Sequence, residues 1–294
     1  MTASAPPEYL GVCHLHKDVS TALQILANGL AATTKECETH TVLEVTGFHH
    51  KESLLATAIY LVGAVAQCIQ SDLGIRKALF DEATLDRDLI RDVESVIGDE
   101  SVDDDFRRKT RDPWFLEGLS HLVIHLARTD LSLHPVGTVL VKTQLKYDVN
   151  DHGLDLIAIY DSGALGITAG EAKAYLEDPN RAIIDASTRL REIDDALRDT
   201  ELRAAVTQLR SSLSHSQQAQ LGAAFWKRER SYYPFLCCDA KHARDWAKKR
   251  KSLRKLAVPV SHKVLVPISF DTARDVFDDL SRLVRAYASG NLTQ

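Results

Sequence analysis

The chain has 294 residues, of which 45% are apolar and 26% are charged, and it contains 14 Gly, 8 Pro and 5 Cys. This composition is typical of a globular protein and excludes a disordered chain, a collagen-like repeat and a disulfide-rich scaffold. The cysteines are odd in number and show no CxxC spacing, which argues against a disulfide framework or a structural zinc site and fits a cytoplasmic location. A net charge of −5 gives no overall attraction to nucleic acid.

The first part of the sequence, residues 1–105, is expected to form a mostly helical region. Its opening residues, MTASAPPEYLG, lack the charged and then apolar profile of a signal peptide. The apolar stretch Leu54–Ile69 is shorter than the roughly 20 residues of a membrane-spanning helix and includes Gln67, so we expect a buried core helix and no membrane contact. The polar run GDESVDDDFRRKTRD at 98–112 predicts a loop, and we place a domain boundary there.

Residues 106–294 are expected to form a second domain, which begins with a helix and three strands. The helix is predicted over Pro113–Arg128, with Asp112 as its N-cap. One polar stripe of this helix carries Glu117, His121 and His125. Strand-like runs follow at Val136–Leu145, Leu154–Tyr160 and Leu165–Tyr175. The turn Asp161-Ser162-Gly163 joins the last two runs into a predicted hairpin.

The remainder of the sequence predicts amphipathic helices as far as Arg230, a strand over His262–Phe270 and a last helix capped by Asp271. Helices and strands that alternate in this way are typical of a mixed α/β domain. The aromatic segment SYYPFLCC, which ends in Cys237 and Cys238, is expected to pack in the core, with base stacking as the alternative.

Chemistry concentrates in the hairpin, whose sequence is HGLDLIAIYDSGALGITAGEAKAY at 152–175. Asp155 stands at the head of an apolar strand, and Glu171 and Lys173 lie two residues apart on one face of the next strand. Because a hairpin brings the head of its first strand beside the tail of its second, we expect the three side chains to converge. The alternative is a simple salt bridge between Lys173 and one of the two acids at a half-exposed sheet edge.

Two carboxylates at the end of an apolar hairpin are costly to bury without a positive partner. Mg²⁺ prefers oxygen ligands and keeps several waters, so Asp155, Glu171 and the backbone carbonyl of Ala172 suffice to bind it, with Mn²⁺ as a substitute. The metal would activate a water and offset charge on a scissile phosphate. Lys173 would orient or deprotonate that water, or balance the developing charge.

Asp155, Glu171, Ala172 and Lys173 resemble the D…(D/E)-x-K core of the PD-(D/E)xK nucleases, although Leu154 replaces the proline that names the motif. The resemblance implies a restriction-endonuclease-like fold, a mixed sheet flanked by helices, and a helix glutamate as a further metal ligand, which would be Glu117. More narrowly, residues 112–288 resemble the HamA nuclease subunits of Hachiman antiphage defence systems, most densely over 152–195. That implies a DNase effector regulated by a HamB-like partner helicase.

A second charged feature is the run KHARDWAKKRKSLRK at 241–255, with eight basic residues and one acid. We predict a basic helix whose side chains contact DNA phosphates. A solvated face is one alternative, and the other is a docking surface for acids such as the eleven between 81 and 105. The predicted phosphate contacts are Lys248, Lys249, Arg250, Lys251, Arg254 and Lys255.

Other catalytic motifs are not supported. Glu171 stands where a phosphate-binding loop requires its Gly-Lys-Ser/Thr run, and His121 and His125 lack the glutamate of an HExxH zinc site. Two further functions stay open beside the regulated DNase: a non-catalytic nucleic-acid-binding or assembly module of the same fold, and a stand-alone restriction endonuclease. The sequence does not distinguish between DNA and RNA as the substrate.

Overall fold

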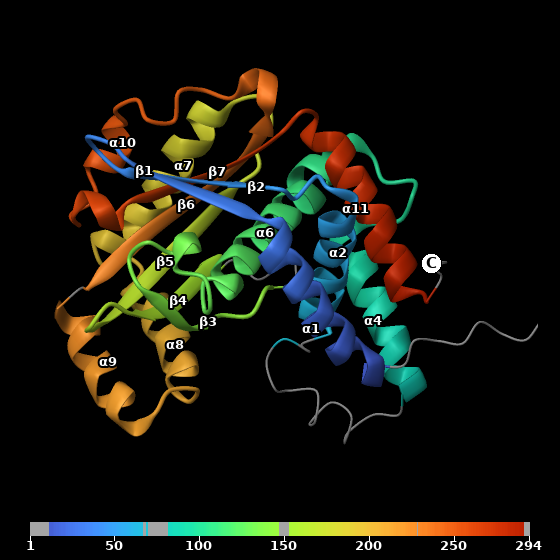
Figure 1. The fold of residues 1–294 in the computed structure, drawn as a ribbon, viewed down its shortest axis with the longest axis horizontal. Helices are drawn as coiled ribbons and strands as arrows, with labels where there is room; N and C mark the ends of the chain where they lie inside the picture. Colours follow the sequence, from blue (N-terminus) through green and yellow to red (C-terminus); the bar gives the residue numbers. More distant parts are fainter. Residues whose placement is uncertain (1–11, 67–68, 70–81, 147–152, 228, 291–294) are drawn as a thin grey trace, which may run out of the picture.

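The computed structural model describes residues 12–66, 69, 82–146, 153–227 and 229–290. A seven-stranded mixed sheet forms the central layer, in the order β1-β2-β7-β6-β5-β4-β3 (Figure 1). β5, β6, β7 and β2 run parallel to one another, whereas β1, β4 and β3 are antiparallel to their neighbours. The strands are β1 (Ala31–Glu36), β2 (Thr41–Thr46), β3 (Thr138–Lys142), β4 (Leu156–Asp161), β5 (Leu165–Lys173), β6 (Arg230–Asp239) and β7 (Val264–Phe270).

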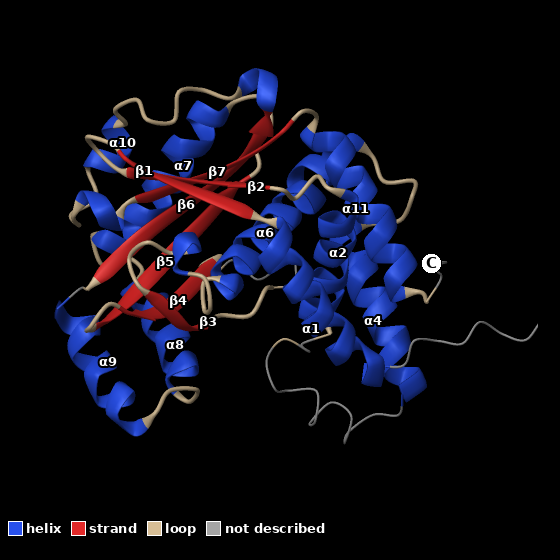
Figure 2. Cartoon of the chain, viewed as in Figure 1, coloured by secondary structure: helices blue, strands red, loops and turns tan. Residues whose placement is uncertain are grey.

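Helices cover both faces of the sheet (Figure 2). One group packs with the apolar core that includes α6, and the other packs with the core that includes α7. The first group is α1 (Val12–Gly29), α2 (Lys51–Val65), α4 (Glu82–Ile97), α6 (Asp112–Leu126) and α11 (Ala273–Ala288). The second is α7 (Pro179–Asp194), α8 (Asp199–Arg210), α9 (His215–Lys227) and the short α10 (Lys251–Arg254).

The strand sequences explain why the sheet is covered on both sides. Successive side chains of a strand point to opposite faces. In β6, Tyr233, Phe235 and Cys237 enter the core on the α6 side, whereas Leu236 and Cys238 enter the core on the α7 side. A strand buried on both faces is apolar at nearly every position, which is what SYYPFLCC shows. Core packing of this segment is therefore confirmed, and its two thiols are buried.

The predicted α/β class, with a mixed sheet and a mostly helical N-terminal region, is confirmed. The strands β1 and β2 were not predicted, and they join the sheet through pairing of β2 with β7. The division into 1–105 and 106–294 stays a prediction, but the sheet contains strands from both sides of it. Part of the expected loop is helical, because residues 104–111 continue directly into α6.

The apolar stretch near residue 54 forms α2, in which ten residues are buried, as expected for a core helix. Its predicted end at 67–69 falls mostly outside the described residues. Among the residues that the structure describes, no helix has the length and apolar character needed to cross a membrane.

Several predicted helix ends were wrong. Asp112 is inside α6 and not its N-cap, because its carboxylate pairs with Arg111 while the preceding turns are already helical. Thr272, not Asp271, precedes α11. Helix was predicted as far as Arg230, where β6 begins instead.

Candidate metal and nucleic-acid site

The hairpin of β4 and β5 brings the predicted triad together. Asp161 pairs with Leu165 at the turn and Leu156 with Gly170 at the far end, so Asp155 lies just beyond the end of the ladder. Its Oδ2 accepts a hydrogen bond from the Ala172 N–H at 2.9 Å. The Lys173 Nζ donates to Glu171 Oε1 at 2.7 Å. The turn is stabilised by Asp161, whose Oδ1 accepts from the N–H of Gly163, at φ +95°.

The Glu171 carboxylate is buried and its charge is not fully compensated. Burial raises its pKa to about 7, and the nearby Asp155 charge adds to the effect, although Lys173 opposes it. The pKa of Lys173 is lowered by burial, but the Glu171 and Asp155 carboxylates outweigh this and raise it. Lys173 is therefore an ammonium ion at neutral pH.

Glu117 reaches the same site from α6, on the other side of the sheet from α7. Burial raises its pKa to about 8, and Asp155 and then Glu171 add repulsion that Lys146 and Lys173 partly relieve. Within the described part of the chain, no hydrogen bond or ion pair reaches the Glu117 carboxylate. Three carboxylates, of which Glu171 is buried and Glu117 and Asp155 are half-buried, thus lie close enough to repel one another.

The donors at this site suit a hard divalent cation, because all of them are oxygens. Asp155 Oδ1 and Glu171 Oε2 have no protein donor among the described residues. The part of the chain that the structure describes does not, however, gather three or more His, Cys, Asp or Glu side chains closely enough to hold an ion on their own. A bound cation would therefore keep water ligands, as Mg²⁺ does.

Sequence reasoning did not assign a role to His121 or Lys142, and the structure places both beside the site. The His121 Nε2 is 2.9 Å from the carbonyl oxygen of Asp155. The Lys142 Nζ is 3.2 Å from His121 Nδ1. Both side chains are buried. Their only signal in the sequence was the polar stripe that His121 shares with Glu117.

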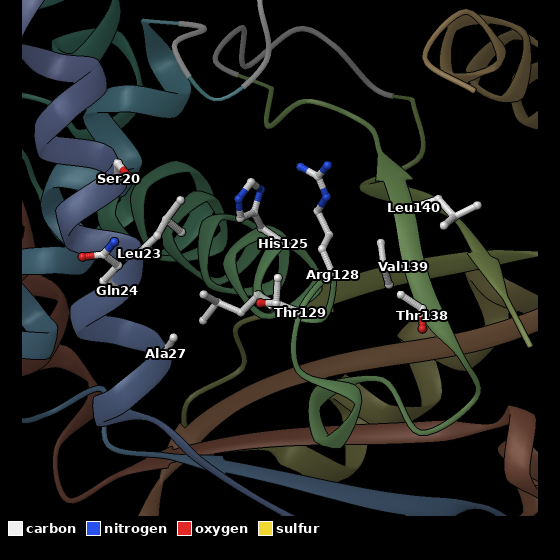
Figure 3. Close-up of a pocket in the computed structure, with 11 residues that line it drawn as sticks. Ser20, Leu23, Gln24, Ala27, His125, Arg128, Thr129, Thr138, Val139 and Leu140 are labelled. Atoms are coloured by element: carbon white, nitrogen blue, oxygen red, sulfur yellow. Dashed lines mark hydrogen bonds between the residues drawn. The ribbon is translucent and has the colours of Figure 1, made fainter. Parts of the chain in front are cut away.

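His125 does not join His121 in a metal site. Figure 3 shows His125 and Arg128 beside the groove between α1 and β3, which has a volume of about 530 Å³. Burial lowers the pKa of His125 to about 3, and Lys142 and Arg128 lower it further. His121 therefore faces the Asp155 backbone, whereas His125 lines the groove between α1 and β3.

The basic run does not form the predicted helix. Only Lys251–Arg254 is α-helical, and the preceding segment is held in a loop by tertiary contacts. The carbonyl of the buried Trp246 is bound by His40 Nε2 at 2.9 Å, and the Arg250 N–H donates to Thr39 Oγ1 at 3.1 Å. These contacts replace the backbone hydrogen bonds that a helix would make.

The six predicted phosphate contacts fall into two groups. The Arg250 guanidinium donates to Asn180 Oδ1 at 3.0 Å, and Lys249 pairs with Glu38 at 2.7 Å. The other four are exposed, and over the described ranges no carboxylate pairs with them: Lys248, Lys251, Arg254 and Lys255. We call these four residues the basic segment. It lies beside α7, which begins six residues after Lys173 (Figure 1).

Acids near residue 100 do not cover the basic segment. Asp104 pairs with Arg107 and Arg274, and Asp105 pairs with Arg108 and Lys109. For these acids, the predicted alternative, in which they pair with the basic run within the same chain, is not seen.

Comparison with known proteins identifies no relative, since neither a family model nor a curated protein matches the chain.

Proposed function

We propose that the chain is a metal-dependent deoxyribonuclease with the PD-(D/E)xK, restriction-endonuclease-like arrangement. Asp155 and Glu171 would hold Mg²⁺ or Mn²⁺, with Glu117 and the Ala172 carbonyl as further ligands. The observation that carries the proposal is the grouping of the buried Glu171 carboxylate with the half-buried carboxylates of Glu117 and Asp155 beside Lys173, at the open end of the central hairpin. Perturbed titratable groups of this kind concentrate at functional sites.

A divalent cation would supply the positive charge that this group lacks. When bound, it would acidify a water molecule and offset charge on the scissile phosphate. Because Lys173 is an ammonium ion at neutral pH, it does not remove a proton from that water. Its place is to donate a hydrogen bond to the water or to the phosphate oxygens, while its contact with Glu171 keeps it in position.

The basic segment gives the substrate a binding surface. On the short helix α10, Lys251 lies three and four residues before Arg254 and Lys255, and like charges at this helical spacing repel one another. Together with the nearby Lys248, these exposed cations favour a polyanionic partner. The basic segment lies beside α7. In β5, Ala169 packs in the core on the α7 side of the sheet. Because side chains alternate along a strand, Glu171 and Lys173 belong to this same side. DNA fits both features, because its phosphates would contact the basic segment and one of them would enter the proposed nuclease site.

The resemblance of residues 152–195 to HamA supports a narrower proposal: the chain is an antiphage effector that a partner helicase holds in check. This part rests on the sequence motif alone. It is tested by adding the product of the neighbouring gene, which should suppress cleavage of undamaged plasmid by the nuclease.

The test of the activity is cleavage of supercoiled plasmid with Mg²⁺, and with EDTA as the blank. Asp155→Asn and Glu171→Gln should each lower the rate by at least about 100-fold while the melting temperature stays within a few degrees. Glu36→Gln is the matched control, because it makes the same carboxylate-to-amide change on the exposed edge strand β1. Variants at Asp155 and Glu171 that cleave as fast as the control would refute the site.

A wild-type protein that binds plasmid but leaves it intact, with and without the neighbouring gene product, would refute the nuclease and favour the non-catalytic binding module. Cleavage at fixed sequences without any partner would favour the restriction enzyme. Parallel assays on RNA of the same length decide between the two nucleic acids.

A further inference from the structure

His121 and Lys142 form a buried polar chain that ends on the backbone of Asp155. Lys142, at the end of β3, has only 3% of its surface exposed, and His121 on α6 has none. Lys142 also donates to the carbonyl of Thr143 at 3.3 Å. Burial of a lysine and a histidine is costly unless they are hydrogen bonded, and here each of them is.

The hydrogen bonds determine which nitrogen of His121 carries the proton. The Asp155 carbonyl oxygen can only accept, so Nε2 must donate to it. Nδ1 is then the acceptor for an N–H of the Lys142 amino group, which donates whether or not it is charged. Burial, with the charge of Lys142, lowers the pKa of His121 well below its ordinary value, which favours the neutral ring. The imidazole therefore has one orientation.

Asp155 is consequently held at both ends. Its carbonyl is bound by His121 from α6, and its carboxylate Oδ2 is bound by the Ala172 N–H from β5. The residues that follow it are fixed to the β3 side, since the N–H of Ile157 donates to Thr143 Oγ1 at 3.0 Å and its carbonyl accepts from the Thr143 N–H at 2.8 Å. Asp155 precedes the first residue of β4, where the ladder itself no longer restrains the backbone.

We propose that His121 is a positioning residue of the metal site: oriented by Lys142, it fixes the Asp155 peptide so that the free carboxylate oxygen is presented to the cation. This inference rests on the proposed function, because it concerns the same site. Partners outside the ligand shell that orient ligands in this way typically change metal affinity by about 10–100-fold.

Two amide substitutions separate positioning from simple packing. In His121→Gln the side-chain amide nitrogen lies where Nε2 was, so it still donates to the Asp155 carbonyl. In His121→Asn the amide reaches only the Nδ1 position and this donor is lost. Mn²⁺ binding to the full chain is measured by isothermal titration calorimetry at pH 7.5, with Asp155→Asn as the reference for loss of the site.

We expect His121→Asn to weaken Mn²⁺ binding by at least about tenfold and His121→Gln by no more than about threefold, at similar melting temperatures. Equal affinity of both variants and the wild type would overturn the positioning role alone, provided that Asp155→Asn abolishes binding. Wild-type protein whose Mn²⁺ binding is absent, or does not depend on Asp155, would overturn the proposed function as well.

Lys142→Met keeps the test decisive if His121→Asn does not fold. It leaves the imidazole in place but removes the donor that orients it, so Mn²⁺ affinity should fall by several-fold. Unchanged affinity in a folded Lys142→Met protein would refute the role of the chain from Lys142 to Asp155.

Discussion

The raised pKa of Glu117 gives a prediction about folding stability that can be tested without any substrate. Its pKa is raised from 4.5 to about 8, chiefly by burial and then by the charges of Asp155 and Glu171. A carboxyl group whose pKa is higher in the folded than in the unfolded protein stabilises the fold only when it is protonated. Its contribution is complete below the unfolded value near 4.5 and is lost as pH rises through about 8.

The size of the effect follows from this shift. One pKa unit corresponds to about 1.4 kcal/mol, so ionising Glu117 between pH 5.5 and pH 8 costs on the order of 3 kcal/mol of folding stability. Glu117→Gln has the shape of the protonated acid and does not ionise. In EDTA, the stability advantage of Glu117→Gln over the wild type should therefore grow by about 3 kcal/mol over this pH range.

Urea denaturation at several pH values in EDTA measures this difference, and Glu36→Gln on the exposed edge strand β1 is the control. A difference between Glu117→Gln and wild type that does not change with pH would refute the burial argument. Addition of Mg²⁺ at pH 8 should then stabilise the wild type, since a ligand that binds only the folded state raises its stability, and it should stabilise Glu117→Gln less.

Three further predictions concern the site and its support. Lys173→Met should lose plasmid cleavage but still bind Mn²⁺ in calorimetry, because Lys173 supplies charge and is not a ligand; loss of Mn²⁺ binding would contradict this. Neutralising the four residues of the basic segment should flatten the dependence of log Kd on log salt for DNA by up to about four units, whereas four exposed cations elsewhere, Lys17, Lys51, Arg91 and Arg282, should not. Arg111→Met should destabilise the protein by about 3–5 kcal/mol in urea, since it leaves the buried Asp112 without its nearest partner. Arg111→Met/Asp112→Leu should recover most of that loss.

Local patterns in the sequence were sufficient to predict the hairpin and the convergence of Asp155, Glu171 and Lys173 at its end. The Asp161-Ser162-Gly163 turn sets the register of β4 against β5, and the register determines that Asp155 meets the end of β5. Because the two strands of a hairpin are close together in the sequence, this register does not depend on residues far along the chain. The outer strand β1, in contrast, is AATTKE and almost entirely exposed, so it lacks the apolar alternation by which strands are recognised.

Long-range contacts account for what the sequence could not show. Lys142 ends a strand and would ordinarily be expected in solvent, but α6 covers it. The run 241–255 was expected to be helical from its composition, whereas His40 and Thr39, some 200 residues earlier, hold the backbone at Trp246 and Arg250 in a loop. Such contacts leave no periodic signal near the residues that they fix.

The helix α6 links these observations, because it contributes to the site twice. Glu117 and His121 are four residues apart and so lie on one face, where the first adds a carboxylate and the second holds the Asp155 backbone. The N-terminal end of α6 is in turn fixed by Trp114, whose indole N–H donates to the Lys146 carbonyl at 2.8 Å. Rotation or sliding of α6 would therefore move one proposed ligand, Glu117, and change the orientation of a second, Asp155, at the same time. The geometry of the proposed metal site thus depends on the docking of one helix against the end of the hairpin.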